Sequence, residues 1–158
     1  LADLQDNDVR VKVIGKRQDL DAQLVKLIEH AEQLSAQNTG MRLQIAFNYG
    51  AREEIADAAA RLAQRVAQGE LEAGNITPDL VDAELSTHGL PDPDLVIRTS
   101  GENRLSNFLL WQCAYSEFYF TDVLWPDFDA STLRAALRAY HQRERRFGRV
   151  EPALSKTD

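Results

Sequence analysis

The sequence predicts an α/β fold in which a mostly parallel central sheet carries helices on both faces. Short apolar runs rich in β-branched residues recur along the chain, and longer segments with helical spacing of apolar residues separate them. This alternation favours parallel strands, because a parallel crossover needs a connection of a dozen residues or more. At 158 residues the chain can bury a sizeable core. We expect one domain over residues 1–150 and a flexible tail over residues 151–158.

The first half of the chain predicts two strands and two helices. Residues 9–14 alternate apolar and polar side chains and are rich in valine, which is typical of a strand. Apolar spacing predicts a helix over residues 20–34, with a stop at Asn38-Thr39-Gly40, whose glycine is free to take the left-handed conformation. Residues 41–47 predict the second strand, and a helix follows that Gly69 ends. The predicted buried stripe of this helix consists of Ile55, Ala59, Leu62, Ala63 and Val66.

The second half of the chain predicts shorter elements. A threonine–proline pair starts a short helix over residues 77–85, and the apolar run over residues 95–97 predicts the third strand. We expect a helix over residues 106–114, a fourth strand over residues 118–120, a rigid turn at Trp-Pro-Asp-Phe and a last helix after it. The candidate N-caps of these two helices are Ser106 or Asn107 for the first and Ser131 for the last.

Charge is spread unevenly along the chain and argues against nucleic-acid binding. The formal net charge is −7, yet residues 134–149 contain six arginines and one acidic residue. The rest of the chain is therefore strongly acidic, whereas nucleic-acid binding needs a broad basic face. A module that binds RNA or another anion through residues 134–149 is the weakest of the alternatives.

Cysteine content and apolar segments favour a cytoplasmic protein. Cys113 has no partner for an internal disulfide, which favours a reducing compartment. The most apolar stretch, residues 108–120, contains Gln112 and Glu117 and is too short and too polar to span a bilayer. Residues 1–8 lack the features of a signal peptide. Because the chain opens on leucine, we expect it to be a piece of a longer polypeptide.

The end of the third strand is the most informative stretch of the chain. The apolar run over residues 95–97 stops at Arg98, and a polar loop with Arg104 and Ser106 follows. A strand that delivers cations and hydroxyl donors to the mouth of a sheet is typical of α/β proteins that bind anions. Two arginines suit a phosphate or diphosphate, because a guanidinium forms bidentate, charge-assisted hydrogen bonds. The pattern alone leaves open a strand followed by a surface loop with two solvated arginines.

Polar residues flank the other predicted strands as well. The carboxyl ends of parallel strands face one edge of the sheet, so we expect a single cluster there. Cations, hydroxyl donors and a carboxylate together suit a diphosphate bound with a divalent cation. Glu117 lies among aromatic residues and needs a partner, because burying an unpaired carboxylate is costly. The expected cluster consists of Asn48, Arg52, Arg98, Arg104, Ser106 and Glu117, where Asn48 has the alternative of satisfying a turn and Arg52 that of a solvated helix residue.

At these residues the chain resembles the cis-prenyltransferase family, most closely its bacterial undecaprenyl diphosphate synthases. The resemblance covers essentially the whole chain, with the motifs in order. Ala51 departs from the family pattern, which usually has glycine or serine at that place. The matching motifs are residues 48–52, 94–102, 104–108, 110–112, 115–118, 125–128 and 143–148.

The resemblance implies a reaction. Enzymes of this family add isopentenyl diphosphate repeatedly to an allylic diphosphate such as farnesyl diphosphate, with Mg²⁺, and form cis double bonds. The undecaprenyl product is the lipid carrier for cell-wall synthesis. Carried over by motif, Arg98, Arg104 and Ser106 hold the isopentenyl diphosphate. Leu105 contributes its backbone to the same site, and Glu117 matches the magnesium ligand.

The resemblance also implies a homodimer and a tunnel. The C-terminal motif that contains Arg146 and Gly148 reaches the substrate phosphates across the dimer, which accounts for the arginine-rich segment. The growing chain occupies a tunnel in enzymes of this family. Candidates for its wall, with core packing as an equal alternative, are Met41, Leu43, Ile45 and Phe47.

One family signature has no match in this chain. The Asp-Gly-Asn-Gly-Arg-Trp motif, which carries the catalytic aspartate, is absent from the sequence. We therefore expect no catalytic residue here, a chain that represents roughly the C-terminal two-thirds of the enzyme, and no activity from this chain alone. The alternative is a non-catalytic partner subunit of a cis-prenyltransferase complex. The intact motif from Arg98 to Ser106 argues against it, because such a subunit need not keep that site.

Overall fold

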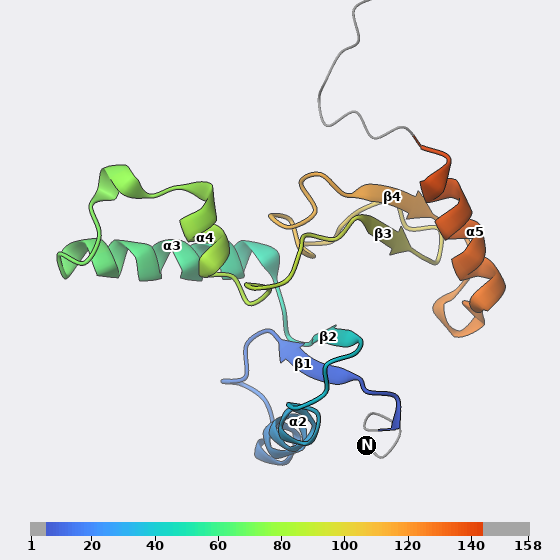
Figure 1. Ribbon diagram of the computed structural model, residues 1–158, viewed down its shortest axis with the longest axis horizontal. Helices are drawn as coiled ribbons and strands as arrows, with labels where there is room; N and C mark the ends of the chain where they lie inside the picture. The colour runs from blue at the N-terminus through green and yellow to red at the C-terminus, as the bar shows by residue number, and fades with distance from the viewer. Residues whose placement is uncertain (1–5, 144–158) are drawn as a thin grey trace, which may run out of the picture. The chain divides into compact units, whose positions relative to one another are not determined.

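The structure, a computed structural model, describes residues 6–143 and confirms the α/β class with parallel strands. Strand β1 (Arg10–Ile14) pairs with β2 (Arg42–Ala46), and β3 (Leu95–Arg98) pairs with β4 (Glu117–Phe120). Both pairs are parallel (Figure 1), as expected for strands that long connections separate in the sequence. The described strands form two two-stranded sheets rather than one continuous sheet.

The chain folds as two compact units. Within the described residues, the first comprises residues 6–90 and 107–111 and holds β1 and β2 with helices α2, α3 and α4. The second comprises residues 91–106 and 112–143 and holds β3 and β4 with helix α5. The single domain over residues 1–150 stays a prediction, and the tail over residues 151–158 lies outside the described residues.

In the first unit, α2 (Ala22–Leu34) lies beside the β1–β2 pair (Figure 1) and satisfies one edge of β1. The backbone N–H of Val11 donates to Oγ of Ser35 at 3.0 Å. The N–H of Val13 donates to Oε1 of Glu32 at 2.8 Å. Side chains at the end of α2 therefore take the place that a neighbouring strand would occupy at this edge.

Helix α2 ends at Leu34, the last residue of the predicted helix, and a turn separates it from Asn38-Thr39-Gly40. The side chain of Ser35 is fully buried, and its hydroxyl donates back into the helix while it accepts from β1. Gly40 does not take the predicted left-handed conformation. Glycine is required there for another reason, because a Cβ would lie 2.5 Å from the carbonyl oxygen of Asp8.

Strand β2 leads into α3 (Ala51–Ala67), whose buried face differs from the predicted one. Ala59 and Ala63 were expected inside, and both are exposed. Alanine occurs on both sides of this helix, and its small side chain carries too little hydrophobic contrast to define the buried face. Gly69 follows the helix in the left-handed conformation (φ 76°), as predicted for its end. The buried residues of α3 are Ala51, Ala58 and Leu62.

Helix α4 (Pro78–Ala83) lies alongside α3 (Figure 1). Thr77 caps it as predicted, because its hydroxyl oxygen accepts from a backbone N–H of the first turn. After α4, Glu84 accepts from Nε of Arg61 at 2.8 Å and from Nη1 of Arg65 at 3.2 Å. The hydrogen bond from Arg61 holds the pKa of Glu84 below its ordinary value. The two arginines thus tie the end of α4 to α3.

In the second unit, α5 (Ala130–His141) packs along β4 (Figure 1). Its N-cap is Asp129 and not the predicted Ser131. Oδ1 of Asp129 accepts from the backbone N–H of Thr132 at 2.8 Å and from the hydroxyl of Ser131 at 2.7 Å. These hydrogen bonds, the backbone one first, lower the pKa of Asp129 to about 2. The predicted rigid turn is present as the short 3₁₀ helix η2 (Trp125–Asp127).

The helix predicted over residues 106–114 is absent, and turns occupy this segment. Ser106, Asn107 and Leu109 have positive φ angles of 52°, 62° and 44°. Right-handed helix formation requires negative φ, so these residues exclude it. Asn107 does serve as a cap, but for α3, which lies far away in the sequence.

Cys113 is buried as a small apolar side chain, and this burial raises the pKa of its thiol. No helix within residues 6–143 has both the length and the apolar character needed to cross a bilayer. The longest of the described helices, α3, has 17 residues and charged side chains throughout.

Candidate functional site

Arg98 is the last residue of β3 and is half-buried. None of the carboxylates in the part of the chain that the structure describes forms an ion pair with it. Ser100 and Gly101 follow in the left-handed conformation, with φ of 66° and 68°. Their N–H groups donate to the carbonyls of Val123 and Thr121 at 2.9 and 3.0 Å. These bonds tie the end of β3 to the segment after β4. They therefore hold the backbone next to Arg98 in place.

The loop after β3 presents further donors. Arg104 forms an ion pair with Glu102, and 67% of its side chain is exposed. Within residues 6–143 the backbone N–H groups of positions 103–106 donate to no protein acceptor. Ser106 is exposed as well. Solvated N–H groups, a hydroxyl and arginines in one loop match the donor set that binds phosphate oxygens.

Glu117 is the first residue of β4 and lies at the other end of the strand pair from Arg98. In the parallel register Glu117 is opposite Leu95, and Phe120 is opposite Arg98. The expectation that Glu117 shares the carboxyl edge with Arg98 is therefore wrong, because a residue that begins a strand lies at its amino end. The two positions are three residue steps apart, roughly 10 Å along the strand axis.

Glu117 already has a cationic partner. Its Oε2 accepts from Nη1 of Arg143 at 2.7 Å, and the two side chains are 29% and 40% exposed. This contact supplies the partner that a carboxylate among aromatic residues was predicted to need. Within the described part of the chain, no three histidine, cysteine or acidic residues gather into a metal site. One carboxylate fits a Mg²⁺ ion whose other ligands are phosphate oxygens and water, and does not fit an all-protein site.

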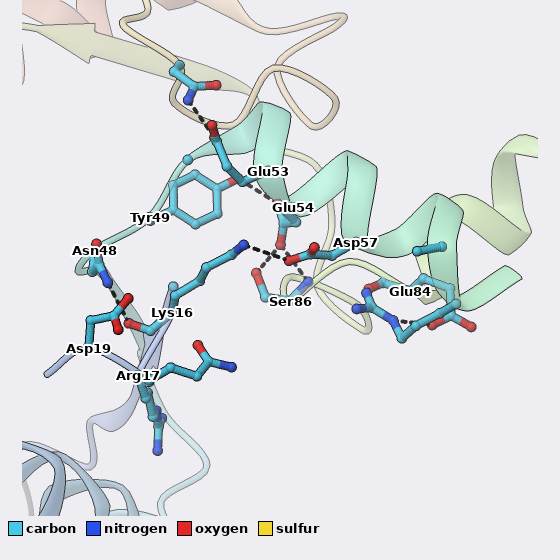
Figure 2. Close-up of a pocket in the computed structure, with 16 residues that line it drawn as sticks. Lys16, Arg17, Asp19, Asn48, Tyr49, Glu53, Glu54, Asp57, Glu84 and Ser86 are labelled. Carbon is cyan, nitrogen blue, oxygen red and sulfur yellow. Dashed lines mark hydrogen bonds and ion pairs between the residues drawn. The ribbon is translucent and has the colours of Figure 1, made fainter. Parts of the chain in front are cut away.

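The first unit has an open groove of about 1220 Å³ beyond the carboxyl ends of β1 and β2 (Figure 2). Lys16 reaches across it from the end of β1 and pairs with Asp57 of α3 at 3.3 Å. Nδ2 of Asn48 donates to the carbonyl of Lys16 at 2.9 Å, with Asn48 at φ 50°. Asn48 therefore satisfies the turn, which is the alternative stated for it above. Arg52 is exposed on the first turn of α3, as expected for a solvated helix residue.

A hydrogen-bonded network beside this groove was missed by sequence reasoning (Figure 2). Glu54 accepts from the hydroxyl of Tyr49 at 2.6 Å and from the backbone N–H of Ser86 at 2.8 Å. The hydroxyl of Ser86 donates to the same carboxylate. The network joins the motif after β2, the first turn of α3 and the segment after α4. No sequence signal marks it, because glutamate in the first turn of a helix is common.

The remaining predicted residues divide into two groups. Arg146 and Gly148 lie outside the described residues. The apolar row of β2 and its flanks is exposed and does not belong to the packed core of the described residues. The exposed fractions are 61% for Met41, 38% for Leu43, 44% for Ile45 and 45% for Phe47.

The fold and the strand-end loop define an α/β protein with a site suited to a phosphate-containing ligand. The family model described as "Putative undecaprenyl diphosphate synthase" matches residues 1–148. The chain belongs to this family, and the resemblance carried by the sequence motifs is confirmed.

Curated relatives in bacteria agree with this assignment. The chain is 56% identical over 155 residues to an isoprenyl transferase of Brucella abortus, covering 98% of this chain and 61% of the relative. It is 55% identical over 148 residues to an isoprenyl transferase of Agrobacterium fabrum, covering 94% of this chain and 60% of the relative. The chain thus spans about three-fifths of the length of these relatives.

Two solved structures have the same fold. Lavandulyl diphosphate synthase from Lavandula x intermedia, solved in complex with dimethylallyl diphosphate, matches with a TM-score of 0.88 and 42% identity, over 90% of this chain and 61% of that one. A probable undecaprenyl diphosphate synthase from Campylobacter jejuni matches with a TM-score of 0.79 and 32% identity, over 94% of this chain and 67% of that one. Both similarities extend over nearly all of this chain.

Proposed function

We propose that this chain is the isopentenyl diphosphate-binding part of a cis-prenyltransferase. The whole enzyme adds isopentenyl diphosphate repeatedly to an allylic diphosphate such as farnesyl diphosphate and forms cis double bonds. The observation that carries the proposal is Arg98, which ends β3 without an ion-pair partner within residues 6–143 and is followed by a loop of solvated donors. Membership of the family supports the class of substrate.

We assign each donor of the loop to oxygens of the diphosphate. The guanidinium of Arg98 binds two diphosphate oxygens at once, because its planar fork matches their geometry. Arg104, whose side chain is 67% exposed, exchanges Glu102 for the diphosphate. The hydroxyl of Ser106 and the N–H of Leu105 donate to the remaining oxygens. Together they hold the substrate by its charged end and leave its carbon chain free to react.

Glu117 is the residue that we assign to Mg²⁺, in contact with a diphosphate that completes the coordination. When bound, magnesium would neutralise negative charge on the allylic diphosphate and so assist its departure as the leaving group. Arg143 contacts Oε2 of Glu117 and would therefore compete with the metal ion for this carboxylate.

The exposed apolar row on β2 supports a path for the growing hydrocarbon chain. Its four side chains alternate along one side of the strand, at positions 41, 43, 45 and 47. We assign to them the tunnel wall. The undecaprenyl product would serve as the lipid carrier for cell-wall synthesis.

We further propose a cytoplasmic homodimer. The single buried Cys113 is in keeping with a reducing compartment. Trp125 and Leu124 are 71% and 56% exposed, and apolar side chains of this size on a surface support a partner interface. Because the Asp-Gly-Asn-Gly-Arg-Trp signature is absent, we expect residues 1–158 alone to be inactive, and turnover by them would contradict this part of the proposal.

The experiment is a kinetic comparison of Arg98→Ala with the full-length wild-type enzyme. We expect the KM for isopentenyl diphosphate to rise about 10- to 100-fold, the loss that follows from removing charge-assisted hydrogen bonds. The KM for farnesyl diphosphate should change less than threefold. Arg98→Lys keeps the charge but loses the fork, so an intermediate KM is expected.

The matched control is Arg10→Ala, which removes an exposed arginine from the start of β1. It should leave both KM values unchanged. If Arg98→Ala raised the KM of the two substrates equally, the assignment of Arg98 to isopentenyl diphosphate would be wrong.

A further inference from the structure

Asn107 occupies the N-terminus of α3, which Gly50 leaves without a side-chain cap. The backbone carbonyl of Asn107 accepts from the N–H of Ala51 at 2.8 Å. Its Oδ1 accepts from the N–H of Arg52 at 2.8 Å, and its Nδ2 donates to Oε2 of Glu53 at 2.9 Å. One residue thus satisfies two of the N–H groups that a helix leaves without internal partners and binds a carboxylate of the first turn.

The three hydrogen bonds of Asn107 anchor it to α3, and the absence of a side chain at Gly50 leaves room for them. A Cβ at Gly50 would lie 2.8 Å from Nδ2 of Asn107 and 2.1 Å from Oε2 of Glu53, so glycine makes room for the contact. The rings of Tyr49 and Phe108, neighbours of Gly50 and Asn107 in the sequence, meet edge to face at 6.1 Å. The hydrogen bond from Asn107 also holds the pKa of Glu53 below its ordinary value.

Ser106, which precedes Asn107, has a left-handed backbone conformation. Ser106 has a φ of 52° and Asn107 a φ of 62°. Asparagine tolerates this left-handed region, but serine adopts it far less often. Such a conformation persists only where the surroundings hold it in place. Within residues 6–143 the side chain of Ser106 makes no hydrogen bond of its own, so the three hydrogen bonds of Asn107 are the adjacent restraint.

We propose that Asn107 is a positioning residue that presets Ser106 for diphosphate binding. The inference rests on the proposed function, in which Ser106 donates to isopentenyl diphosphate. Consecutive Cα atoms lie about 3.8 Å apart, so anchoring Asn107 restricts where the Ser106 hydroxyl can be. A donor that is already in place binds its acceptor without the cost of ordering a loop. Loss of the anchor should therefore weaken binding of isopentenyl diphosphate and spare the allylic substrate.

The test uses steady-state kinetics of the full-length enzyme with isopentenyl and farnesyl diphosphates. Asn107→Ala removes both side-chain hydrogen bonds, and we expect the KM for isopentenyl diphosphate to rise about tenfold. The KM for farnesyl diphosphate should change less than twofold. A residue that only stabilised α3 would lower the melting temperature without this selective change in KM.

A charge-matched pair of variants tests the contact itself. Asn107→Asp places a second carboxylate against Glu53, so the KM for isopentenyl diphosphate should rise at least as much as in Asn107→Ala. Adding Glu53→Gln supplies an amide donor to the new carboxylate and restores the hydrogen bond in the reverse direction. We expect the double variant to return to within threefold of the wild-type KM. This rescue also reports on the contact if Asn107→Ala fails to fold.

Two outcomes overturn the inference, and each is distinguishable from failure of the proposed function. If Arg98→Ala raises the KM for isopentenyl diphosphate but neither Asn107→Ala nor Asn107→Asp does, Asn107 has no positioning role although the site is assigned correctly. If the double variant stays as impaired as Asn107→Asp, the contact with Glu53 is not what positions Ser106. If Arg98→Ala has no selective effect either, the proposed site itself is wrong and the inference falls with it.

Discussion

Arg143 and Glu117 form an ion pair in which Nη1 of the arginine lies 2.7 Å from Oε2 of the glutamate. The pair joins the residue range just after α5 to the first residue of β4. Both side chains are partly exposed, so the pair is worth about 1 kcal/mol or less. It is weak enough for a divalent cation to displace, and it occupies the carboxylate that we assign to magnesium.

This competition predicts the effect of Arg143→Gln in the full-length enzyme. Without the competing cation, the Mg²⁺ concentration for half-maximal activity should fall by about two- to fivefold, the change that corresponds to 0.5–1 kcal/mol. The measurement is a Mg²⁺ titration of the initial rate at saturating substrates. Arg138→Gln, which changes an exposed arginine within α5, is the control. A higher Mg²⁺ requirement in Arg143→Gln would instead mean that Arg143 assists ligand binding.

The lowered pKa of Asp129 should make the stability of the protein depend on pH. Its pKa is lowered to about 2 in the folded protein by its hydrogen bonds to the first turn of α5, and it has the ordinary value of 3.8 when unfolded. The ionised form therefore stabilises the fold fully above about pH 5, and this contribution is lost progressively as the pH falls toward 2. Asp129→Asn keeps a capping oxygen without the titration. The difference in urea midpoint between wild type and variant should shrink from pH 6 to pH 3, and a constant difference would contradict the assignment.

Substitution of Ser35 tests how much stability is lost when one edge of β1 loses its hydrogen-bond acceptor. Ser35→Ala removes the acceptor of the Val11 N–H at a fully buried position, which should destabilise the protein by about 2 kcal/mol. Urea unfolding followed by circular dichroism measures this change. The exposed residue Gln37 provides the control, and Gln37→Ala should change stability by less than about 0.5 kcal/mol. Equal effects of the two substitutions would mean that this edge does not depend on Ser35.

Neighbouring alanines test which face of α3 is buried. Ala58 is fully buried and Ala59 is exposed. Ala58→Leu should destabilise the protein by about 1–3 kcal/mol through overpacking, whereas Ala59→Leu should stay within about 0.5 kcal/mol of wild type. Thermal unfolding of the two variants gives the answer directly. If Ala59→Leu destabilised the protein more than Ala58→Leu, the buried face would be the one that the sequence pattern predicted.

Local patterns were enough to find most elements of this fold. The positions of β1, β2, β3 and β4 follow from short β-branched and apolar runs, and Thr77 with Pro78 marks the start of α4. Such signals work because strand alternation and helix capping involve residues within a few positions of one another. The sequence pattern failed in the alanine-rich α3, where hydrophobic contrast is small, and before α5, where Asp129 and Ser131 are two candidate caps two positions apart.

By itself, the sequence determined the α/β class, the family and the donor-rich loop after Arg98, since each depends on residue types at fixed spacing along the chain. Tertiary structure alone decided that Asn107 caps α3 and that Glu117 pairs with Arg143 at the amino end of β4. Both contacts join positions that are 55 and 26 residues apart in the chain. A pairing at such separation depends on strand register and on where loops return, and no local pattern records either.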